Sequence, residues 1–453
     1  MCNLFGIKRV NKMAELKIIG GGLAGCEAAW QAAERGIKVK LYEMKPVCFS
    51  PAHTSQDLCE LVCSNSLKGA GLDNACGLLK EEMRRMNSVV IACADATRVP
   101  AGGALAVDRD RFARMVTDKI KCHENIEVVS ALVEDINPDE YTIVATGPLT
   151  HGALTDSIAK LTGAEYLSFY DAAAPVIETE SINFDKVYKS ARYDKGTADY
   201  INCPMDKEEY AAFYEALINA ERAPMHGDID KSNVFEGCMP VEIMASRGVD
   251  TLRFGPLKPK GLPDPKTGRE PYAVVQLRQD NTEGTMFNMV GFQTNLKFGE
   301  QKRVFSMIPG LEEANFLRLG VMHRNTYINS PEVLKADFSM HKYPKVFFAG
   351  QITGVEGYVE SAVSGLMAGM NAARAIKGEE SIVLPPSTVT GALSKYITIG
   401  AVKGRFQPMN ANFGIIEHHV GRIKNKKERY LAISEEALQS LDDALKSAGC
   451  SKN

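Results

Sequence analysis

The feature that most constrains this chain is a glycine-rich turn between a short apolar run and an alanine-rich stretch. Residues 16–20 are typical of a buried strand, and residues 24–35 predict a helix. The turn between them has the pattern Gly20-x-Gly22-x-x-Gly25. Glycines at these positions allow a tight turn, close approach of a pyrophosphate to the backbone, and close packing of the helix on the strand. The helix N-terminus would then face the anion.

The acidic residue expected of a dinucleotide site follows at the end of the next predicted strand. Residues 37–42 form that strand, and Glu43 stands 21 residues after Gly22, where a carboxylate can accept hydrogen bonds from a ribose. A lone glycine motif is weak evidence, but strand, turn, helix and acid occur here in the required order. The pattern therefore predicts a dinucleotide site formed by Gly20, Gly21, Gly22, Leu23, Ala24, Gly25 and Glu43.

Two further segments favour FAD over NAD as that dinucleotide. The sequence Ala-Thr-Gly at residues 145–147, a predicted strand end, is similar to a segment common in two-dinucleotide flavoproteins. Residues 348–354 are similar to the strand-turn-helix that caps the flavin end of FAD in that class, which adds Gly350 and Gly354 to the predicted site. The sequence contains no second GxGxxG, so a separate Rossmann site for NADPH is not predicted.

Length and changes of character along the chain predict a discontinuous FAD-binding domain. With 453 residues the chain is too long for one compact core. Scattered prolines and glycines begin near residue 187, and a buried strand and a long helix return after residue 345. We therefore predict an α/β protein of the two-dinucleotide flavoprotein class, with a Rossmann-type domain that carries an inserted α+β substrate domain. The predicted parts are residues 1–12, a disordered N-terminal extension; residues 13–186 and 325–453, the FAD-binding domain with the C-terminal helices; and residues 187–324, the inserted domain.

Composition argues against several classes of protein. The formal net charge of -3 gives no global sign of a nucleic-acid partner, so RNA contacts would have to come from a local patch. No apolar run approaches the length of a membrane span and no signal peptide opens the chain, which predicts a cytoplasmic protein without a membrane partner. The 11 cysteines include no CxxC pair and the 8 histidines no ligand pattern, so we predict reduced thiols and no metal site.

Two cysteines stand apart because they lie in short polar contexts rather than on apolar helix faces. They are Cys63 in Leu-Val-Cys-Ser-Asn-Ser and Cys238 in Phe-Glu-Gly-Cys-Met-Pro. A loop cysteine near a helix start or a cation can ionise at neutral pH and react. Most cysteines are instead small core residues, and this interpretation applies to Cys26, Cys76, Cys93 and Cys122. Spacing alone does not single out Cys63 and Cys238.

Two stretches carry an excess of basic residues. Residues 247–324 have 12 Lys and Arg against 8 Asp and Glu, and residues 422–429, Arg-Ile-Lys-Asn-Lys-Lys-Glu-Arg, form a short basic run. Either could follow the phosphates of an RNA. A solvated face is the more common role of such a stretch, so the sequence alone assigns neither of them to RNA.

Nine longer strings point to one family. They are Gly-Gly-Gly-Leu-Ala-Gly at 20–25, Glu-Leu-Val-Cys-Ser-Asn-Ser-Leu at 60–67, Leu-Lys-Glu-Glu-Met-Arg-Arg at 79–85, Phe-Glu-Gly-Cys-Met-Pro at 235–240, Asp-Thr-Leu-Arg-Phe-Gly-Pro at 250–256, Gly-Phe-Gln-Thr-Asn-Leu at 291–296, Met-His-Arg-Asn-Thr-Tyr at 322–327, Gly-Val-Glu-Gly-Tyr-Val-Glu-Ser at 354–361 and Phe-Gln-Pro-Met-Asn-Ala-Asn-Phe-Gly at 406–414. The chain from about residue 16 to residue 430 resembles the folate- and FAD-dependent tRNA (uracil-5-)-methyltransferases of bacteria, the TrmFO family.

The resemblance implies an enzyme that makes 5-methyluridine in the T-loop of tRNA, with FAD as cofactor and methylenetetrahydrofolate and NADPH as co-substrates. In such chemistry a thiolate adds to C6 of uracil, and a base later removes the proton from C5. By resemblance Cys238 is the candidate nucleophile and Cys63 its partner and candidate base, although the two roles could be exchanged. No protein partner is implied, and we expect a monomer. The other implied site residues are Tyr358 near the flavin and, near folate and substrate, His323, Arg324 and Asn325.

Three alternatives stay open. Some relatives methylate ribosomal RNA instead of tRNA, and no residue separates the two substrates. The neighbouring family of FAD-dependent wobble-uridine modifiers is longer, with an extra C-terminal helical region, whereas only about 40 residues follow residue 414 here. The third alternative is a catalytically idle flavoprotein that binds RNA or a protein, and the presence of both Cys63 and Cys238 argues against it.

Overall fold

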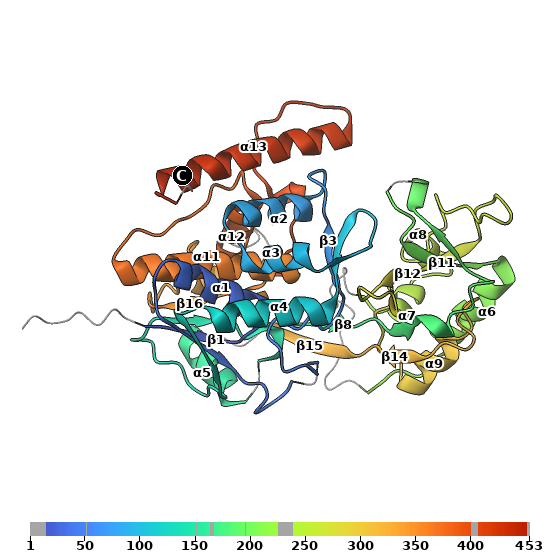
Figure 1. Ribbon diagram of the computed structural model, residues 1–453, viewed down its shortest axis with the longest axis horizontal. Helices are drawn as coiled ribbons and strands as arrows, with labels where there is room; N and C mark the ends of the chain where they lie inside the picture. Colours follow the sequence, from blue (N-terminus) through green and yellow to red (C-terminus); the bar gives the residue numbers. More distant parts are fainter. Residues whose placement is uncertain are drawn as a thin grey trace, which may run out of the picture.

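The two largest sheets, each with its own hydrophobic core, lie side by side in the molecule (Figure 1). The computed structural model describes residues 15–50, 52–150, 152–163, 167–194, 196–224, 239–399 and 406–450, without the side chains of residues 167–171, 323 and 324. Within these ranges, none of the helices combines the length and the apolar character needed to cross a membrane.

The first sheet is parallel, and its strands come from both ends of the described chain. They are β1 (Leu16–Ile19), β2 (Val39–Glu43), β6 (Ile126–Ser130), β7 (Thr142–Val144) and β16 (Val346–Phe348). Their order is β16-β7-β1-β2-β6, with Leu16 opposite Val39 and Lys17 opposite Thr142. The central strand β1 leads directly into Gly20, so the glycine turn lies at the carboxyl edge of the sheet, where folds of this kind bind ligands.

Helices α1 (Leu23–Glu34) and α11 (Tyr358–Lys377) pack against each other beside this sheet. Small residues make the contact close, because a Cβ on Gly365 would overlap the backbone of Ala24, and one on Gly369 would overlap the next turn of α1. A larger side chain at either glycine would push the two helices apart. The glycine motif and the C-terminal helix therefore belong to one packed body.

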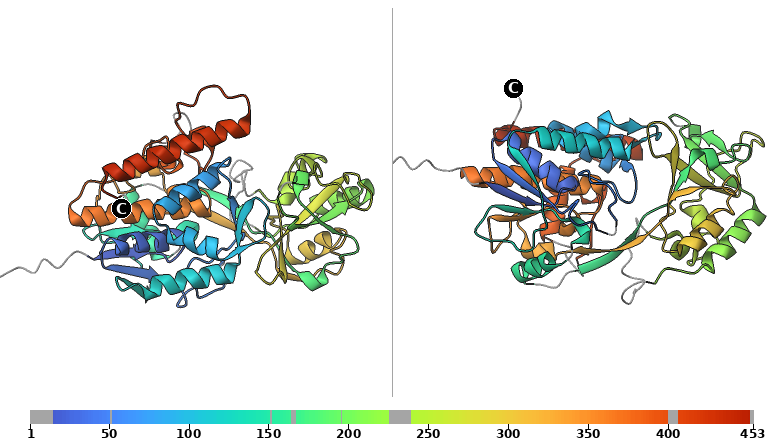
Figure 2. Two further views of the ribbon diagram at one scale, coloured as in Figure 1. Left: turned by 45° about the horizontal axis from the view of Figure 1, so that its top comes forward. Right: turned by 60° about the horizontal axis from the view of Figure 1, so that its bottom comes forward.

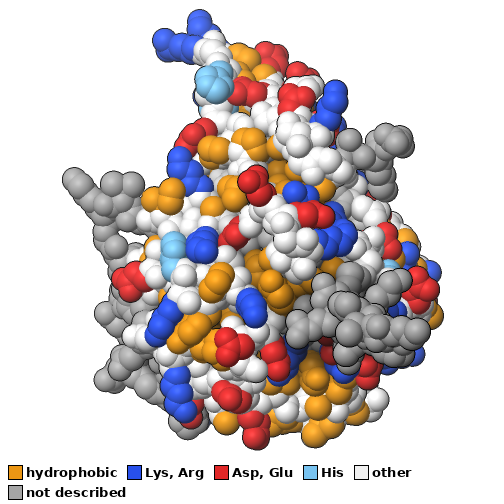
Figure 3. All heavy atoms as spheres, turned by 90° about the vertical axis from the view of Figure 1, so that its left-hand side faces the viewer, with side chains coloured by type: hydrophobic (Ala, Val, Ile, Leu, Met, Phe, Trp, Pro, Cys, Tyr) orange, Lys and Arg blue, Asp and Glu red, His pale blue; other side chains and the backbone are white. Residues whose placement is uncertain are grey.

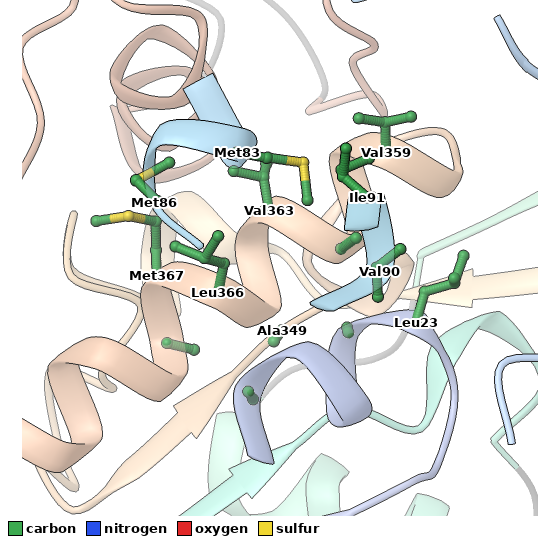
Figure 4. Close-up of a cluster of buried hydrophobic side chains, with 14 of the residues drawn as sticks. Leu23, Met83, Met86, Val90, Ile91, Ala349, Val359, Val363, Leu366 and Met367 are labelled. Carbon is green, nitrogen blue, oxygen red and sulfur yellow. The ribbon is translucent and has the colours of Figure 1, made fainter. Parts of the chain in front are cut away.

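Helices α2 (Ala75–Arg85) and α3 (Val89–Ala96) cover α11 with apolar side chains (Figure 4). The apolar pattern of residues 78–86 predicts a helix at α2, whereas none is predicted at α3, because eight residues are too few to show a helical period. The buried side chains that meet in this layer are Met83 and Met86 of α2, Val90 and Ile91 of α3, and Val363, Leu366 and Met367 of α11.

A buried glutamate of α2 satisfies the backbone at the start of α12 (Val389–Ile399). Glu82 is fully buried and accepts hydrogen bonds from the Val389 N–H at 2.7 Å and the Thr390 N–H at 2.9 Å. The Thr390 hydroxyl donates a third bond at 2.6 Å. Burial raises the pKa of Glu82 to about 7, because the loss of hydration outweighs these hydrogen bonds.

We expect the Glu82 carboxyl to make the protein less stable as pH rises. The folded state holds its proton up to about pH 7, whereas an exposed glutamate releases it near 4.5. The stabilisation is therefore complete below the lower value and lost as pH rises through the upper one. Between pH 5 and pH 8 this amounts to about 2 kcal/mol of unfolding free energy.

Urea unfolding of the wild type and of Glu82→Gln at these two pH values measures the effect. The wild type should lose about 2 kcal/mol more than the variant between them, because glutamine has no proton to release over this range. Equal losses in the two proteins would contradict the assignment.

The second sheet is antiparallel and has the order β10-β11-β12-β13-β9-β14. Figure 2 shows from two further directions that it stands beside the first sheet. Buried side chains such as Phe213, Val241 and Phe305 pack its helices onto it. Its strands are β9 (Val176–Glu178), β10 (Tyr188–Ser190), β11 (Tyr200–Met205), β12 (Ala273–Gln279), β13 (Met286–Met289) and β14 (Phe316–Arg318), and its helices are α6 (Lys207–Ile218), α7 (Val241–Ala245), α8 (Thr251–Phe254) and α9 (Phe298–Phe305).

A two-stranded ribbon joins the two cores. Strands β8 (Leu167–Ala172) and β15 (Met322–Tyr327) pair in antiparallel fashion, so the chain leaves the first core and returns to it along neighbouring paths. That is the connectivity of an inserted unit. The predicted fold class, an α/β protein whose parallel-sheet domain carries an insertion, is confirmed.

Three helices begin earlier than their apolar periodicity predicts, which starts near residue 78 for α2, near residue 361 for α11 and near residue 435 for the last helix of the chain. Helix α11 begins at Tyr358 instead of residue 361, directly after Gly357, whose φ of 121° ends the preceding turn. Helix α13 (Lys426–Ser447) begins nine residues before the predicted residue 435. The Asn425 side chain accepts hydrogen bonds from the first backbone N–H groups of α13. Because the first turn of α13 is polar, the apolar periodicity that predicts the helix starts only further along the chain.

The interpretation of Cys26, Cys76 and Cys93 as buried core residues is confirmed, and that of Cys122 is wrong. Cys122 is exposed because it is the last residue of α4 (Arg109–Cys122), beyond the apolar stripe of that helix. The remaining elements are β3 (Ser66–Gly69), β4 (Arg98–Val99), β5 (Ala104–Val107), α5 (Ala153–Thr162) and α10 (Ser330–Val333), with 3-10 turns at Gly147–Leu149, Thr179–Ser181, Arg192–Asp194, Gln351–Thr353 and Phe413–Ile415.

Candidate active site

A cleft opens at the carboxyl edge of the first sheet, where the glycine turn meets the ends of β2 and β7. It brings together three segments that were predicted separately from the sequence. From the first segment come Gly20, Gly21, Gly22, Leu23, Ala24 and Glu43; from the second Ala145, Thr146 and Gly147; and from the third Gly350, Gln351, Tyr358 and Ser361.

The start of α1 faces this cleft without a cap of its own. Its N-cap residue Gly22 offers no side chain, and its first turn holds no acidic residue. A Cβ added to Gly22 would meet no atom within 4 Å, so the space beside the turn is open. The N–H groups of the first turn are therefore left for a ligand, and an anion suits them best.

Glu43 holds the glycine turn from the other side. Its Oε2 accepts a hydrogen bond from the Gly21 N–H at 2.8 Å, and its Oε1 accepts one from the Lys45 N–H at 3.0 Å. A Cβ on Gly21 would lie 2.7 Å from Oε2, so only glycine permits this approach. Each carboxylate oxygen keeps a lone pair for a ribose hydroxyl. The residues of the cleft thus fit a dinucleotide such as FAD.

Two of the predicted cofactor glycines, Gly25 and Gly354, are not among the residues that line the cleft. A Cβ on Gly25 would overlap the carbonyl oxygen of Gly20, so this glycine packs the helix onto its own turn. Gly354 has a φ of 85°, and a Cβ there would lie 2.5 Å from the Phe406 ring. Both shape the backbone around the cleft.

Cys63 meets Tyr358 at the wall of the cleft. Its Sγ lies 2.9 Å from the Tyr358 hydroxyl, which also accepts hydrogen bonds from the Cys63 N–H at 2.8 Å and the Ser64 N–H at 3.3 Å. Because two N–H groups occupy the lone pairs of that oxygen, its hydrogen is directed to the sulfur. Burial, with Cys63 beside it, raises the pKa of Tyr358 well above its usual value, so the phenol stays protonated and remains a donor.

An arginine of the second sheet holds the segment that follows Cys63. Arg278 of β12 is 7% exposed and donates from Nη2 to the Ser64 hydroxyl at 2.8 Å and from Nε to Asn65 Oδ1 at 3.0 Å. The Asn65 amide in turn donates to the Gln279 carbonyl at 2.9 Å. The loop that carries Cys63 is therefore fixed by residues of the other core.

Two further arginines hold the segment that precedes Cys63. Arg109, the first residue of α4, donates to the Leu61 carbonyl at 3.0 Å and pairs with Asp280 at 3.0 Å. Arg318 of β14 lies 3.4 Å from the Val62 carbonyl. Burial, and then repulsion by Arg109, lowers the pKa of Arg318, which remains a cation.

Sequence reasoning missed all three arginines, because no motif marks them. One signal was available for Arg109. The sequence predicts a helix at residues 109–120, and Arg109 is its first residue, where a cation is unfavourable to the helix dipole. A residue that breaks such a rule often has another role. For Arg278 and Arg318 the sequence carries no comparable signal.

Of the other predicted site residues, only Asn325 has a described side chain. Asn325 of β15 is buried, at 3% exposure. The side chains of His323 and Arg324 and the whole of Cys238 lie outside the described residues, so their roles stay predictions. No cluster of three or more His, Cys, Asp or Glu side chains suited to a metal ion occurs in the described ranges.

Comparison with known proteins gives one consistent set of relatives. The family described as "Glucose inhibited division protein A" matches residues 15–380. The chain is 60% identical over 428 residues to the methylenetetrahydrofolate--tRNA-(uracil-5-)-methyltransferase TrmFO of Acetivibrio thermocellus, covering 94% of this chain and 98% of that protein. It is 58% identical over 431 residues to the protein of the same name in Halalkalibacterium halodurans, covering 95% and 98%.

Solved structures with the same fold include GidA of Aquifex aeolicus. Its form II crystal structure matches with a TM-score of 0.71 at 17% identity, over 98% of this chain and 75% of that one. The form I crystal gives a TM-score of 0.66 at 17% identity, over 94% and 76%. At this identity the likeness is one of fold, and the GidA chain extends beyond it.

Proposed function

This chain belongs to the TrmFO family, and on that premise we propose that it transfers the carbon of 5,10-methylenetetrahydrofolate to C5 of the T-loop uridine of tRNA. The product is 5-methyluridine, and NADPH supplies the reducing equivalents through FAD. The observation that carries the proposal is the Cys63 sulfur, 2.9 Å from the Tyr358 hydroxyl at the wall of the dinucleotide cleft. This contact supports the proposal that a reactive sulfur lies beside a redox cofactor.

The chemistry needs a thiolate because C5 of uracil is a poor nucleophile. In the proposed reaction the sulfur of Cys238 adds to C6, and the electron pair of the C5–C6 bond moves into the ring as an enolate. C5 then forms its bond to the methylene carbon of the folate, and the two carbon–nitrogen bonds of that carbon break with their electron pairs going to the folate nitrogens. A base removes the C5 proton, the electron pair returns to the ring, and the bond between sulfur and C6 breaks.

Cys63 is the proposed base at C5. As a thiolate it would take the C5 proton, and the Tyr358 hydroxyl would donate a hydrogen bond to the thiolate before that step. Arg109 and Arg278 hold the segments before and after this residue, which keeps the sulfur beside the Tyr358 hydroxyl. If instead Cys63 is the nucleophile and Cys238 the base, the same groups take part in the reaction.

The residues of the cleft would hold FAD at three places. The open turn at Gly22 suits the pyrophosphate, Glu43 suits the ribose, and Gly350 with Tyr358 lies where the isoalloxazine is expected. When bound, FAD would supply the two electrons that convert the transferred methylene to methyl. The protein's part is to place sulfur and ring against one pyrimidine and to exclude water.

The target uridine is expected to leave its stack to enter the site, since the T-loop folds over it. We assign folate and the pyrimidine to the neighbourhood of His323, Arg324 and Asn325. The proposed enzyme acts in the cytoplasm as a monomer. Gly25 and Gly354 would act by shaping the backbone around the cofactor.

An assay with purified components tests the proposal. Unmodified tRNA, methylenetetrahydrofolate and NADPH should yield 5-methyluridine at the T-loop position, detected by mass spectrometry of digested RNA. A parallel reaction with S-adenosylmethionine in place of folate and NADPH should yield none. Product formation only from S-adenosylmethionine would overturn the proposal. If only ribosomal RNA were methylated, the proposed reaction would stand and ribosomal RNA would take the place of tRNA as the substrate.

A further inference from the structure

The start of α13 carries a concentration of basic side chains that the proposed chemistry does not use. We call Arg422, Lys424, Lys426, Lys427 and Arg429 the basic segment. Four of its members are exposed, Arg429 is partly buried, and the single acidic residue among them is Glu428. Figure 3 shows a few Lys and Arg side chains at the top edge of the molecule.

The charges of the basic segment are left almost without counter-ions. Among the described residues its one ion pair joins Lys427 to Asp73 at 3.9 Å, the outer limit of such a contact. Glu417 and Glu436 have partners elsewhere, since Glu417 pairs with Lys395 and Glu436 is hydrogen-bonded to the His419 ring. The basic segment therefore projects uncompensated positive charge.

The order of charges along α13 also opposes its dipole. Three of the first four residues are basic, although the N-terminus of a helix is its positive end. The acidic pairs of the helix, at residues 435–436 and 442–443, lie further along. Since the reverse order would stabilise the helix, the basic first turn indicates a requirement other than folding.

An aromatic pair supports the cations. The rings of Phe413 and Tyr430 stack at 4.1 Å, and Lys426 Nζ and Arg429 Cζ each lie 5.4 Å from the centre of the Tyr430 ring. Cation–π contacts of this kind restrict the two side chains while leaving their hydrogen-bond donors in water. The positive charges are thus presented at a defined place.

The position of the basic segment relates it to the reactive sulfur. The Ser434 hydroxyl donates to the Leu72 carbonyl at 2.7 Å, which holds α13 over the turn between β3 and α2. Strand β3 begins three residues after Cys63. In Figure 1 the first turn of α13 is the end of that helix nearest the second core. The basic segment therefore lies at the end of α13 nearest the second core, and α13 packs over the part of the chain that follows Cys63.

We propose that the basic segment binds the sugar-phosphate backbone of the RNA substrate at a stretch away from the reacting uridine. The proposal rests on the proposed function and adds the surface that holds the rest of the molecule. Lysine and arginine side chains on a solvated surface contact phosphates without reading sequence. The segment would therefore contribute affinity and orientation but no base specificity.

The triple variant Lys424→Glu/Lys426→Glu/Lys427→Glu tests the proposal. Acidic residues in a first helical turn favour the helix, so this variant should fold at least as well as the wild type. We expect its Kd for unmodified tRNA, measured by fluorescence anisotropy, to rise at least about tenfold at moderate salt. The slope of log K against log salt should become less steep by about two. NADPH-dependent flavin reduction without RNA should be unchanged.

A control variant with the same change of net charge shows whether a loss of affinity depends on the position of the lysines or only on the net charge of the protein. Lys38→Glu/Lys119→Glu/Lys342→Glu alters three exposed lysines on other parts of the first core and should bind tRNA like the wild type. The proposal is overturned if the basic-segment variant keeps the wild-type Kd and slope, or if the control loses as much affinity. A wild type that methylates no RNA would instead refute the proposed function.

Discussion

Gly22→Trp is expected to give a folded protein without flavin. A Cβ at Gly22 meets no atom within 4 Å, so the new side chain has room, and that room is the part of the cleft beside the start of α1. Trp would occupy the pyrophosphate position and separate the anion from the first-turn N–H groups. Losing two charge-assisted hydrogen bonds costs about 3 kcal/mol or more, which lowers affinity at least about 100-fold.

Flavin absorbance per chain after gel filtration measures the outcome, and circular dichroism reports the fold. Gly299→Trp is the matched control, because a Cβ at Gly299 also meets no atom within 4 Å, and Gly299 is an exposed residue in the first turn of α9, in the second core. The control should keep its flavin. A Gly22→Trp protein that is yellow and active would place the dinucleotide elsewhere.

The parts of the fold that the sequence predicts best are those in which neighbouring residues decide the structure. The strand, turn and helix around Gly22 follow from local glycine chemistry, and the structure has them at β1 and α1. Glu43 lies against the same turn because it ends the adjacent parallel strand. In these cases sequence order and spatial order coincide.

Contacts between distant segments could not be predicted in the same way. Tyr358 reaches Cys63 across 295 residues, and Arg278 reaches Asn65 across 213. Neither pair has a spacing or periodicity that a single sequence displays. Family resemblance marked Tyr358 and Cys63 separately, but their contact depends on how α11 and the second core meet the loop after residue 60.

The limits of the inserted unit depend on pairing between strands rather than on composition. Strand β9 joins the second sheet although it precedes residue 187, because it pairs with β13 and β14. The amino-acid composition of the chain changes only after β9, because a short apolar strand contains the same types of residue whether it belongs to the first sheet or to the second. We propose that the inserted unit comprises residues 173–321, between the two strands of the ribbon.

Cys63→Ala is expected to abolish methylation while leaving flavin bound. A positioned proton-transfer group contributes about 10²–10⁴-fold to a rate, so kcat should fall by that factor. The flavin should remain because the cleft is lined by Val62 and Tyr358, and Cys63 itself is not among its lining residues. Single-turnover formation of 5-methyluridine and flavin absorbance, measured on one preparation, separate the two effects.

Tyr358→Phe should have a smaller and different effect. It removes the hydroxyl 2.9 Å from the Cys63 sulfur and keeps the ring in the cleft wall. A hydrogen bond to a charged group contributes about 1.5–3 kcal/mol, so kcat should fall by about 10- to 150-fold. The optimum of the rate should move to higher pH, because the thiolate has lost its donor. The KM for RNA should not change.

RNA containing 5-fluorouridine distinguishes the role of the Cys63 sulfur from that of the Cys238 sulfur. Fluorine at C5 cannot be removed as a proton, so the covalent adduct at C6 accumulates when the nucleophile is present. Cys63→Ala should still form this adduct, and Cys238→Ala should not. The reverse result would exchange the nucleophile and the base. Near-normal methylation by Cys63→Ala would remove Cys63 from the reaction, because no rate of that size survives the loss of its proton acceptor.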